Sequence, residues 1–109
     1  MAKQSSHEAK PIAAVAKEAA KGLELRERHG RGGTEVGLHR AKQLKAREAI
    51  DLPTLKKMRS YFARHKVGKR GKNWADPDQP SAGYIAWLLW GGDEGKAWVE
   101  QEMAKAESA

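Results

Sequence analysis

Hydrophobic residues recur at helical spacing along most of the chain, and one stretch is far denser than the others. It begins at Ser81, and its seven residues from Tyr84 to Trp90 are all apolar, before a Gly-Gly-Asp break at 91–93. A short helix that is apolar on every side is one that other elements surround. The pattern predicts an all-α fold, a compact bundle of about five short helices around this Trp-rich central helix. A partner-binding patch is the alternative interpretation of the stretch.

The other predicted helices are amphipathic and have recognisable start signals. Pro11 and Pro53 each suit the first turn of a helix. Thr34 and Ser81 are good N-cap residues, and Asp93 is expected to cap the last helix. The expected ranges are 11–29, 34–49 and 53–66, followed by the central helix from Ser81 and a last helix from Asp93.

The length of 109 residues fits one domain, which we place over residues 10–107 behind a mobile, polar tail at residues 1–9. The absence of cysteine excludes disulfides and thiolate metal sites. The longest apolar run is too short to span a bilayer, and the start, MAKQSSHEAK, lacks the apolar core of a signal peptide. We expect an intracellular or particle-borne protein that is neither secreted nor bound to a membrane.

The formal net charge is +7, and the charged residues are distributed unevenly along the chain. Residues 26–72 contain fifteen Lys and Arg against four Asp and Glu, whereas residues 73–109 contain two against seven. A basic block beside an acidic one is typical of a surface that binds nucleic acid, and also of copies that attract each other head to tail.

The helix predicted over 34–49 carries a polar stripe of Arg40, Gln43 and Arg47 outside its apolar arc. Arginine and glutamine can each form paired hydrogen bonds with base edges, so this stripe is what a groove-reading helix would present. A solvated polar face is the alternative. The helices predicted over 34–49 and 53–66 together resemble a helix-turn-helix in outline only, because the turn between them contains Pro53 rather than the usual glycine.

The helix predicted over 53–66 has a basic outer side. Lys57, Tyr61 and Arg64 lie along one line, with Lys56 and Arg59 beside it, a mixture suited to phosphate contact and base stacking. Tyr61 fits the rim of the core equally well.

Two loops are candidates for further contacts. The loop at 29–34 is glycine-rich and holds Arg31; it could cradle a phosphate, although it lacks the lysine of a P-loop, or it could simply connect two helices. The segment 67–80 has no apolar period and carries a basic arm that could follow a phosphate backbone. Trp74 in this segment is expected to pack on the core, with base stacking as the alternative. The basic residues of the arm are Lys69, Arg70 and Lys72.

Enzyme chemistry has little support in the sequence. The four histidines are scattered without metal-ligand spacing, and no serine or threonine has an evident base partner. We therefore expect no catalytic residue, no metal site and no cofactor. Arg64, His65 and Asp93 are the best polar trio, and we interpret them as buried hydrogen bonds that tie two helices together rather than as a catalytic group.

Three segments carry a resemblance to a known family: HGRGGTEVGLHRA at 29–41, MRSYFARHKV at 58–67 and PSAGYIAWLLWGGDEGKAW at 80–98. They resemble a small domain found in tailed-bacteriophage proteins, alone or attached to head proteins such as portals and maturation proteases. The resemblance extends over about two-thirds of the chain. It implies a viral protein, in the host cytoplasm or the virion, associated with the genome or the capsid, and it implies no catalytic residue.

The combined prediction is a small nucleic-acid-binding protein, with DNA the favoured partner, that uses a basic helical face and a basic loop. The alternative is a virion structural or adaptor protein that contacts neighbouring head proteins through surfaces of opposite charge.

Overall fold

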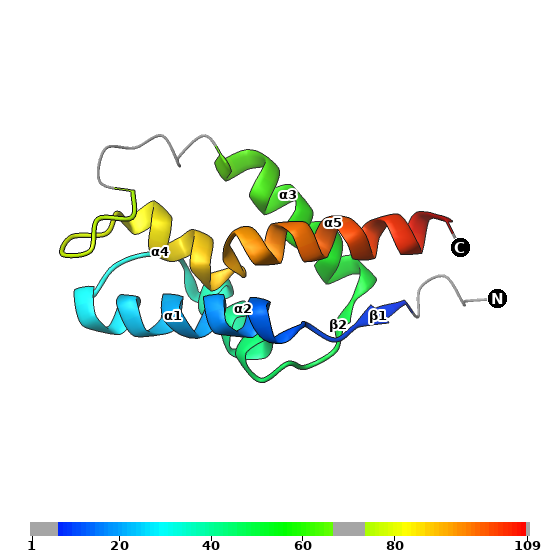
Figure 1. Ribbon diagram of the computed structural model, residues 1–109, viewed down its shortest axis with the longest axis horizontal. Helices are drawn as coiled ribbons and strands as arrows, with labels where there is room; N and C mark the ends of the chain where they lie inside the picture. Colours follow the sequence, from blue (N-terminus) through cyan, green and yellow to red (C-terminus); the bar gives the residue numbers. More distant parts are fainter. Residues whose placement is uncertain (1–6, 67–73, 109) are drawn as a thin grey trace.

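The computed structural model describes residues 7–66 and 74–108, and within them the chain is mostly helical (Figure 1). This confirms the predicted all-α bundle of about five helices. The elements in chain order are β1 (Glu8–Ala9), α1 (Ala13–His29), α2 (Glu35–Lys45), β2 (Ile50–Asp51), α3 (Leu52–His65), α4 (Ala82–Leu89) and α5 (Gly92–Ser108).

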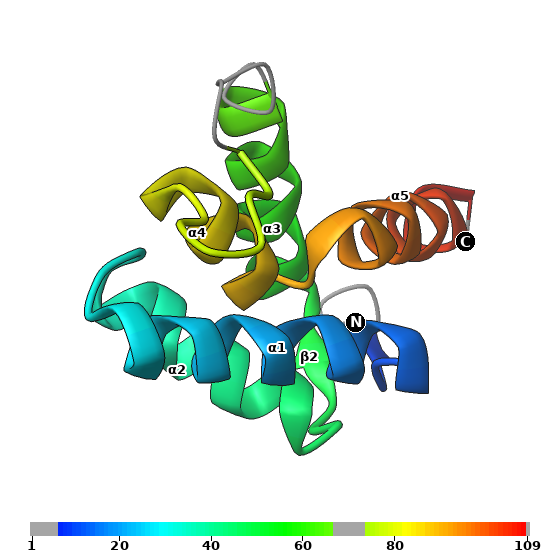
Figure 2. The same cartoon turned by 60° about the vertical axis from the view of Figure 1, so that its left-hand side comes forward.

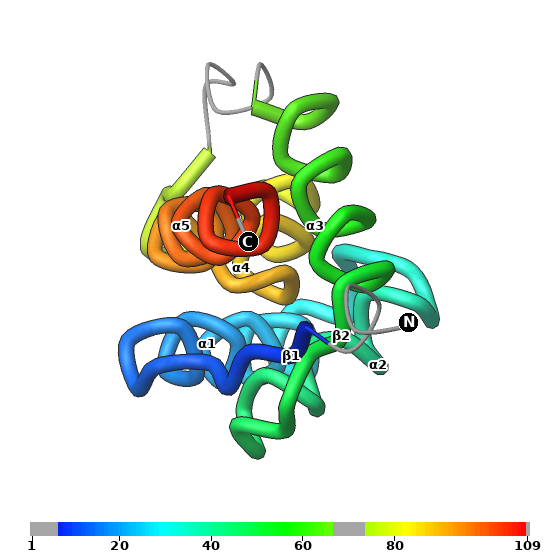
Figure 3. Tube along the Cα trace, turned by 90° about the vertical axis from the view of Figure 1, so that its right-hand side faces the viewer, coloured from blue at the N-terminus to red at the C-terminus, as the bar shows by residue number. Residues whose placement is uncertain are grey.

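The helices form two layers with a crossing helix beside them. In Figures 2 and 3, α1 and α2 lie side by side below α4 and α5, while α3 stands at a steep angle and crosses α5. α1 packs against α2, α4 and α5, so it is the base of the bundle. Its Gly22 faces α4 directly: a Cβ atom there would lie 2.8 Å from the Leu89 backbone nitrogen, so the two helices cross in close contact.

The core is built around the tryptophans of the apolar stretch, as the sequence predicted. Trp87, Trp90 and Trp98 are buried. Trp74 is partly buried and packs on the same core, with its ring 6.0 Å from that of Trp87 in an edge arrangement. The interpretation of Trp74 as a residue that joins its segment to the core is confirmed, and the Trp-rich helix is core rather than a free patch.

Several predicted helix starts are confirmed at the level of single hydrogen bonds. The Thr34 hydroxyl accepts a bond from the Gly37 N–H at 3.3 Å, and the Ser81 hydroxyl accepts one from the Tyr84 N–H at 3.0 Å. α3 begins one residue before Pro53, because Asp51 caps it by accepting a bond from the Thr54 N–H.

Two other starts differ from the prediction. α1 begins at Ala13, so Pro11 is a buried residue just before the helix rather than part of its first turn. α5 begins at Gly92, which places Asp93 inside the first turn. The Asp93 carboxylate accepts a bond from the Trp87 indole Nε1–H at 2.9 Å, so it joins α5 to α4 instead of capping its own helix.

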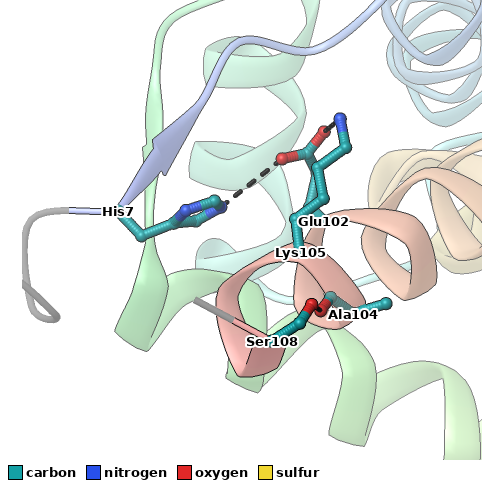
Figure 4. Close-up of polar contacts among 5 residues, drawn as sticks. All are labelled: His7, Glu102, Ala104, Lys105 and Ser108. Carbon is teal, nitrogen blue, oxygen red and sulfur yellow. Dashed lines mark hydrogen bonds and ion pairs between the residues drawn. The ribbon is translucent and has the colours of Figure 1, made fainter.

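The segment expected to be a mobile tail is attached to the bundle at its described end. Glu8 and Ala9 form β1, which pairs antiparallel with β2, and Ala9 is buried. His7 Nε2 lies 3.4 Å from a carboxylate oxygen of Glu102 on α5, whose other oxygen is 3.1 Å from Lys105 Nζ (Figure 4). Residues 1–6 lie outside the described residues. The domain therefore includes residues 7–9, which the sequence predicts to belong to a mobile tail.

The glycine-rich loop between α1 and α2 is packed closely on α4. Gly32 and Gly33 both have positive φ, and a Cβ atom on them would lie 2.6 Å from Ile85 Cβ and 2.5 Å from Leu89 Cδ1. Arg26 Nε donates to the Gly32 carbonyl at 3.0 Å. The loop is thus a tight connector, which favours the second of its two interpretations.

Candidate nucleic-acid interface

The polar stripe predicted on α2 is not an exposed reading face. α2 ends at Lys45, so Arg47 lies beyond the helix, where its Nε donates to the Pro11 carbonyl at 2.7 Å. Arg40 is only 7% exposed, and its guanidinium lies 5.6 Å from the ring centre of Trp90 and bonds to the Gln43 side chain. Burial lowers the pKa of Arg40 from its usual value, and the nearby Asp51 carboxylate opposes this. The groove-reading interpretation of this stripe is therefore wrong.

Tyr61 belongs to the core, not to the outer surface of α3. Its side chain is buried, and its ring stacks on that of Trp90 with centroids 4.6 Å apart and planes 9° apart. The ring of His65 lies 4.4 Å away. Burial raises the pKa of the Tyr61 hydroxyl to about 12, against a partial offset from the Arg64 charge. Tyr61 is covered by these neighbours, so it is not the base-stacking residue that one interpretation expected.

Arg31 extends from the glycine-rich loop to the entrance of α4. Its guanidinium donates to the Pro80 carbonyl at 2.8 Å and to the Gln79 side chain at 3.4 Å, while the side chain remains exposed. These bonds join two loops, which accounts for Arg31 without a ligand. The predicted arm with Lys69, Arg70 and Lys72 lies outside the described residues.

The basic side of α3 forms a groove with the first turn of α2. Lys56, Ser60 and Arg64 follow one another at every fourth position, and Lys57 lies beside them, so these side chains share one face of the helix. The groove has a volume of about 470 Å³. We call it the basic groove, and it is lined by Val36, Lys56, Lys57, Ser60, Arg64 and Trp90.

The cations of the basic groove have no ion-pair partner among the described residues, a property that they share with other exposed cations such as Lys42 and Lys45. Over residues 7–66 and 74–108, no carboxylate lies within ion-pair distance of Lys56, Lys57 or Arg64. All three side chains belong to exposed residues. Their charge is therefore available to an external anion.

The acidic side of α5 is, by contrast, largely paired within the chain. Glu100 accepts from Lys96 at 2.8 Å, and Glu107 lies 3.1 Å from Arg59 of α3. Glu102 has His7 and Lys105 as its partners. In the folded protein the acidic residues of α5 are largely paired, so the unpaired charge of the two surfaces is mainly basic.

The trio of Arg64, His65 and Asp93 does not form the buried tie that we expected. Arg64 and His65 are exposed near the end of α3, with His65 against the Tyr61 ring, whereas Asp93 bonds to the Trp87 indole. Within the described part of the chain, no group of three or more His, Cys, Asp or Glu side chains could hold a metal ion.

A second groove, about 630 Å³ in volume, lies between α1 and α2. Its floor contains the partly buried Leu23 and Leu38, and Lys42 and Lys45 of α2 line it together with Arg26 and Glu27 of α1. An apolar floor with three cations and one carboxylate around it could accept an acidic protein segment.

Among the described residues proposed from the sequence, the structure brings Lys56, Lys57 and Arg64 together in one exposed site. Sequence reasoning missed Ser60 and Val36; the four-residue spacing of Lys56, Ser60 and Arg64 could have indicated Ser60, but Val36 lines the groove only because the fold brings the first turn of α2 near α3. No helix in the described segments is both long and apolar enough to cross a membrane. Comparison of the chain with family models, curated proteins and solved structures gives no match.

Proposed function

We propose that this protein binds nucleic acid, with DNA the favoured partner, through the basic groove on α3. The observation that supports the proposal is the alignment of Lys56, Lys57 and Arg64 on one helix face with no carboxylate in ion-pair range among the described residues. Lysine and arginine placed in this way neutralise phosphates and release the counterions condensed on a nucleic acid. The protein acts as a binding module rather than as an enzyme.

The contacts available in the basic groove favour the phosphate backbone over base edges. Phosphate contacts fix position without reading sequence, whereas base reading needs exposed side chains that fit a groove of the duplex. Arg40, the best base-reading candidate in the sequence, is buried against Trp90. We therefore propose binding with little dependence on base sequence.

Salt-dependent binding of labelled oligonucleotides tests the proposal. A variant with Lys56→Ala, Lys57→Ala and Arg64→Ala should bind more weakly, and the slope of log affinity against log salt should fall by up to about three units, since each phosphate contact contributes about 0.9. The control replaces Lys10 and Lys17 by alanine, two exposed cations that line neither groove described above and have no ion-pair partner among the described residues. Equal slopes for the parent and the groove variant would contradict the proposal.

The alternative function is that of a structural or adaptor protein of a virus particle, and the groove between α1 and α2 supports it. Lys42 and Lys45 flank the apolar floor formed by Leu23 and Leu38, which suits an amphipathic acidic segment of a neighbouring subunit. In this case a Lys42→Ala, Lys45→Ala variant should abolish a salt-sensitive association between proteins, whereas the groove variant on α3 should behave as the parent does.

A further inference from the structure

Next to the basic groove lies an aromatic pocket of about 420 Å³. Residues from α3, α4 and the segments before α2 and α4 meet there, and Arg64 and Trp90 line both the pocket and the basic groove. A strand held by its phosphates along α3 would therefore pass the mouth of the pocket. The lining residues used below are Tyr61, Arg64, His65, Trp74, Gly83 and Trp90.

The rings around the aromatic pocket are fixed by packing among themselves. Trp74 packs edge-on against Tyr84, with ring centres 5.4 Å apart, and against Trp87 at 6.0 Å. Trp90 is stacked on Tyr61. Because these contacts lie within the protein, the pocket exists before any ligand binds, which reduces the entropy lost on binding.

Gly83 lines the pocket without a side chain. A Cβ atom at Gly83 would lie 3.5 Å from Trp74 Cζ3, which is ordinary contact, and its backbone does not have positive φ. The space beside the partly buried Trp74 indole is therefore empty because residue 83 is glycine, and the backbone there is not strained.

We infer that the aromatic pocket takes one unpaired base of a single-stranded nucleic acid while Arg64 and Lys57 contact the adjoining phosphates. This inference rests on the proposed function and specifies its ligand. Aromatic side chains stack on any base through its π-face, and a cationic groove that follows the backbone is the usual companion of such stacking. Arginine at the pocket mouth can contact the phosphate next to the stacked base.

The same geometry disfavours a duplex at the pocket. In a duplex the bases are paired and stacked inside, and the phosphates alone face a protein surface outside the grooves. A base can enter a pocket between aromatic side chains only after it has left the stack, which a single strand permits without loss of base pairing. The protein should therefore bind single strands more tightly than duplexes of the same sequence.

Binding of the unaltered protein to three oligonucleotides of equal length tests the inference: a single strand, its duplex, and a single strand whose sugars lack bases. We expect the abasic strand to bind at least about tenfold more weakly than the normal strand, because it keeps the phosphates and loses stacking. Equal affinity for the normal and abasic strands would overturn the inference and leave the proposed function standing. Absence of salt-sensitive binding to all three would overturn both.

A pocket-filling variant gives an independent test. Gly83→Leu should place a branched side chain beside Trp74 and reduce the preference for the normal strand over the abasic strand to about one, with the salt dependence unchanged. Gly83→Ala is the matched control, since it makes the same backbone change with only one methyl group, and it should keep most of the preference. An unchanged preference in a folded Gly83→Leu protein would place the stacked base elsewhere and overturn the inference.

Discussion

The close crossing of α1 over α4 gives a sharp test of the fold through Gly22→Ala. The added methyl carbon would lie 2.8 Å from the Leu89 nitrogen, 2.9 Å from Leu88 Cβ and 3.0 Å from the Leu88 carbonyl carbon, where ordinary contact begins at 3.4 Å. Two of these three atoms are backbone, so the helices themselves must separate. Overpacking of this kind costs about 1–3 kcal/mol.

The same substitution also gains stability, because alanine is better than glycine inside a helix by about 1 kcal/mol. Rigid backbone atoms resist the shift more than a flexible side chain would, so we place the overpacking in the upper part of its range. The net loss expected for Gly22→Ala is about 1–2 kcal/mol, which corresponds to a fall of roughly 4–12 °C in Tm for a domain of this size.

Gly83→Ala provides the matched control, since its methyl group meets only Trp74 Cζ3 at 3.5 Å. The control should melt at or above the parent temperature. Thermal and urea unfolding followed by circular dichroism measures both variants. If Gly22→Ala were as stable as Gly83→Ala, the two helices would not approach as closely as described, and the reasoning would be refuted.

Three further predictions concern single side chains. Trp90→Ala should lower the free energy of unfolding by roughly 3–5 kcal/mol in urea titrations, because it removes the ring between Tyr61 and Gly37; a melt like that of the parent would contradict its central place in the core. Tyr61, whose pKa is raised to about 12 from 10.0, keeps its proton when the unfolded chain loses it, so stability should fall as pH rises from 10 towards 12, and Tyr61→Phe should remove this part of the alkaline loss. Asp51→Ala should cost about 1 kcal/mol through loss of the α3 cap. Because the bonds from Thr54 lower the pKa of Asp51 from its usual 3.8, the charge-dependent part of this contribution should begin to decline as pH falls below about 4 and disappear only below the lowered pKa, so the urea midpoints of parent and variant should converge through that acid range.

The parts of the fold that depend on neighbouring residues were predictable from the sequence. Thr34 and Ser81 cap their helices through a hydroxyl that accepts a backbone N–H three residues ahead, a geometry that needs no tertiary contact. The apolar run around Trp87 could hardly be anything other than core, because no amphipathic face remains to meet water.

The residues whose predicted positions were wrong are those whose side chains point to the core or to solvent according to a partner distant in sequence. Arg40 and Tyr61 each have a long apolar body and a polar end, so they fit the surface and the core equally well until Trp90 lies beside them. The end of α2 was also placed too late, since Ala46 and Arg47 continue a good helical pattern but the chain turns there, with φ of 55° at Arg47. The two-residue pairing of β1 with β2 is too short to leave a periodic signal.

Of the candidate site, only the residues on α3 could be predicted from the sequence. The spacing along 53–66 indicates which cations share a face, and Lys57 and Arg64 follow from it. Whether the cations of that face are free or paired with carboxylates depends on where the carboxylates of α5 lie, which a single sequence does not show. The aromatic pocket is formed by segments distant in sequence, so it could not be predicted either.

The contact of His7 with Glu102, together with the β1–β2 pairing, bears on the order in which the chain folds. His7 leaves the ribosome long before Glu102 is synthesised, so this contact needs nearly the whole chain, whereas β1 can pair with β2 once residue 51 has emerged. Closing this loop costs conformational entropy, so we expect the contact of His7 with Glu102 to form after the helices have packed. The N-terminal strand is joined to the bundle by a two-residue pairing and one side-chain contact, so its amide protons should exchange with solvent more readily than those of α4 in the finished protein.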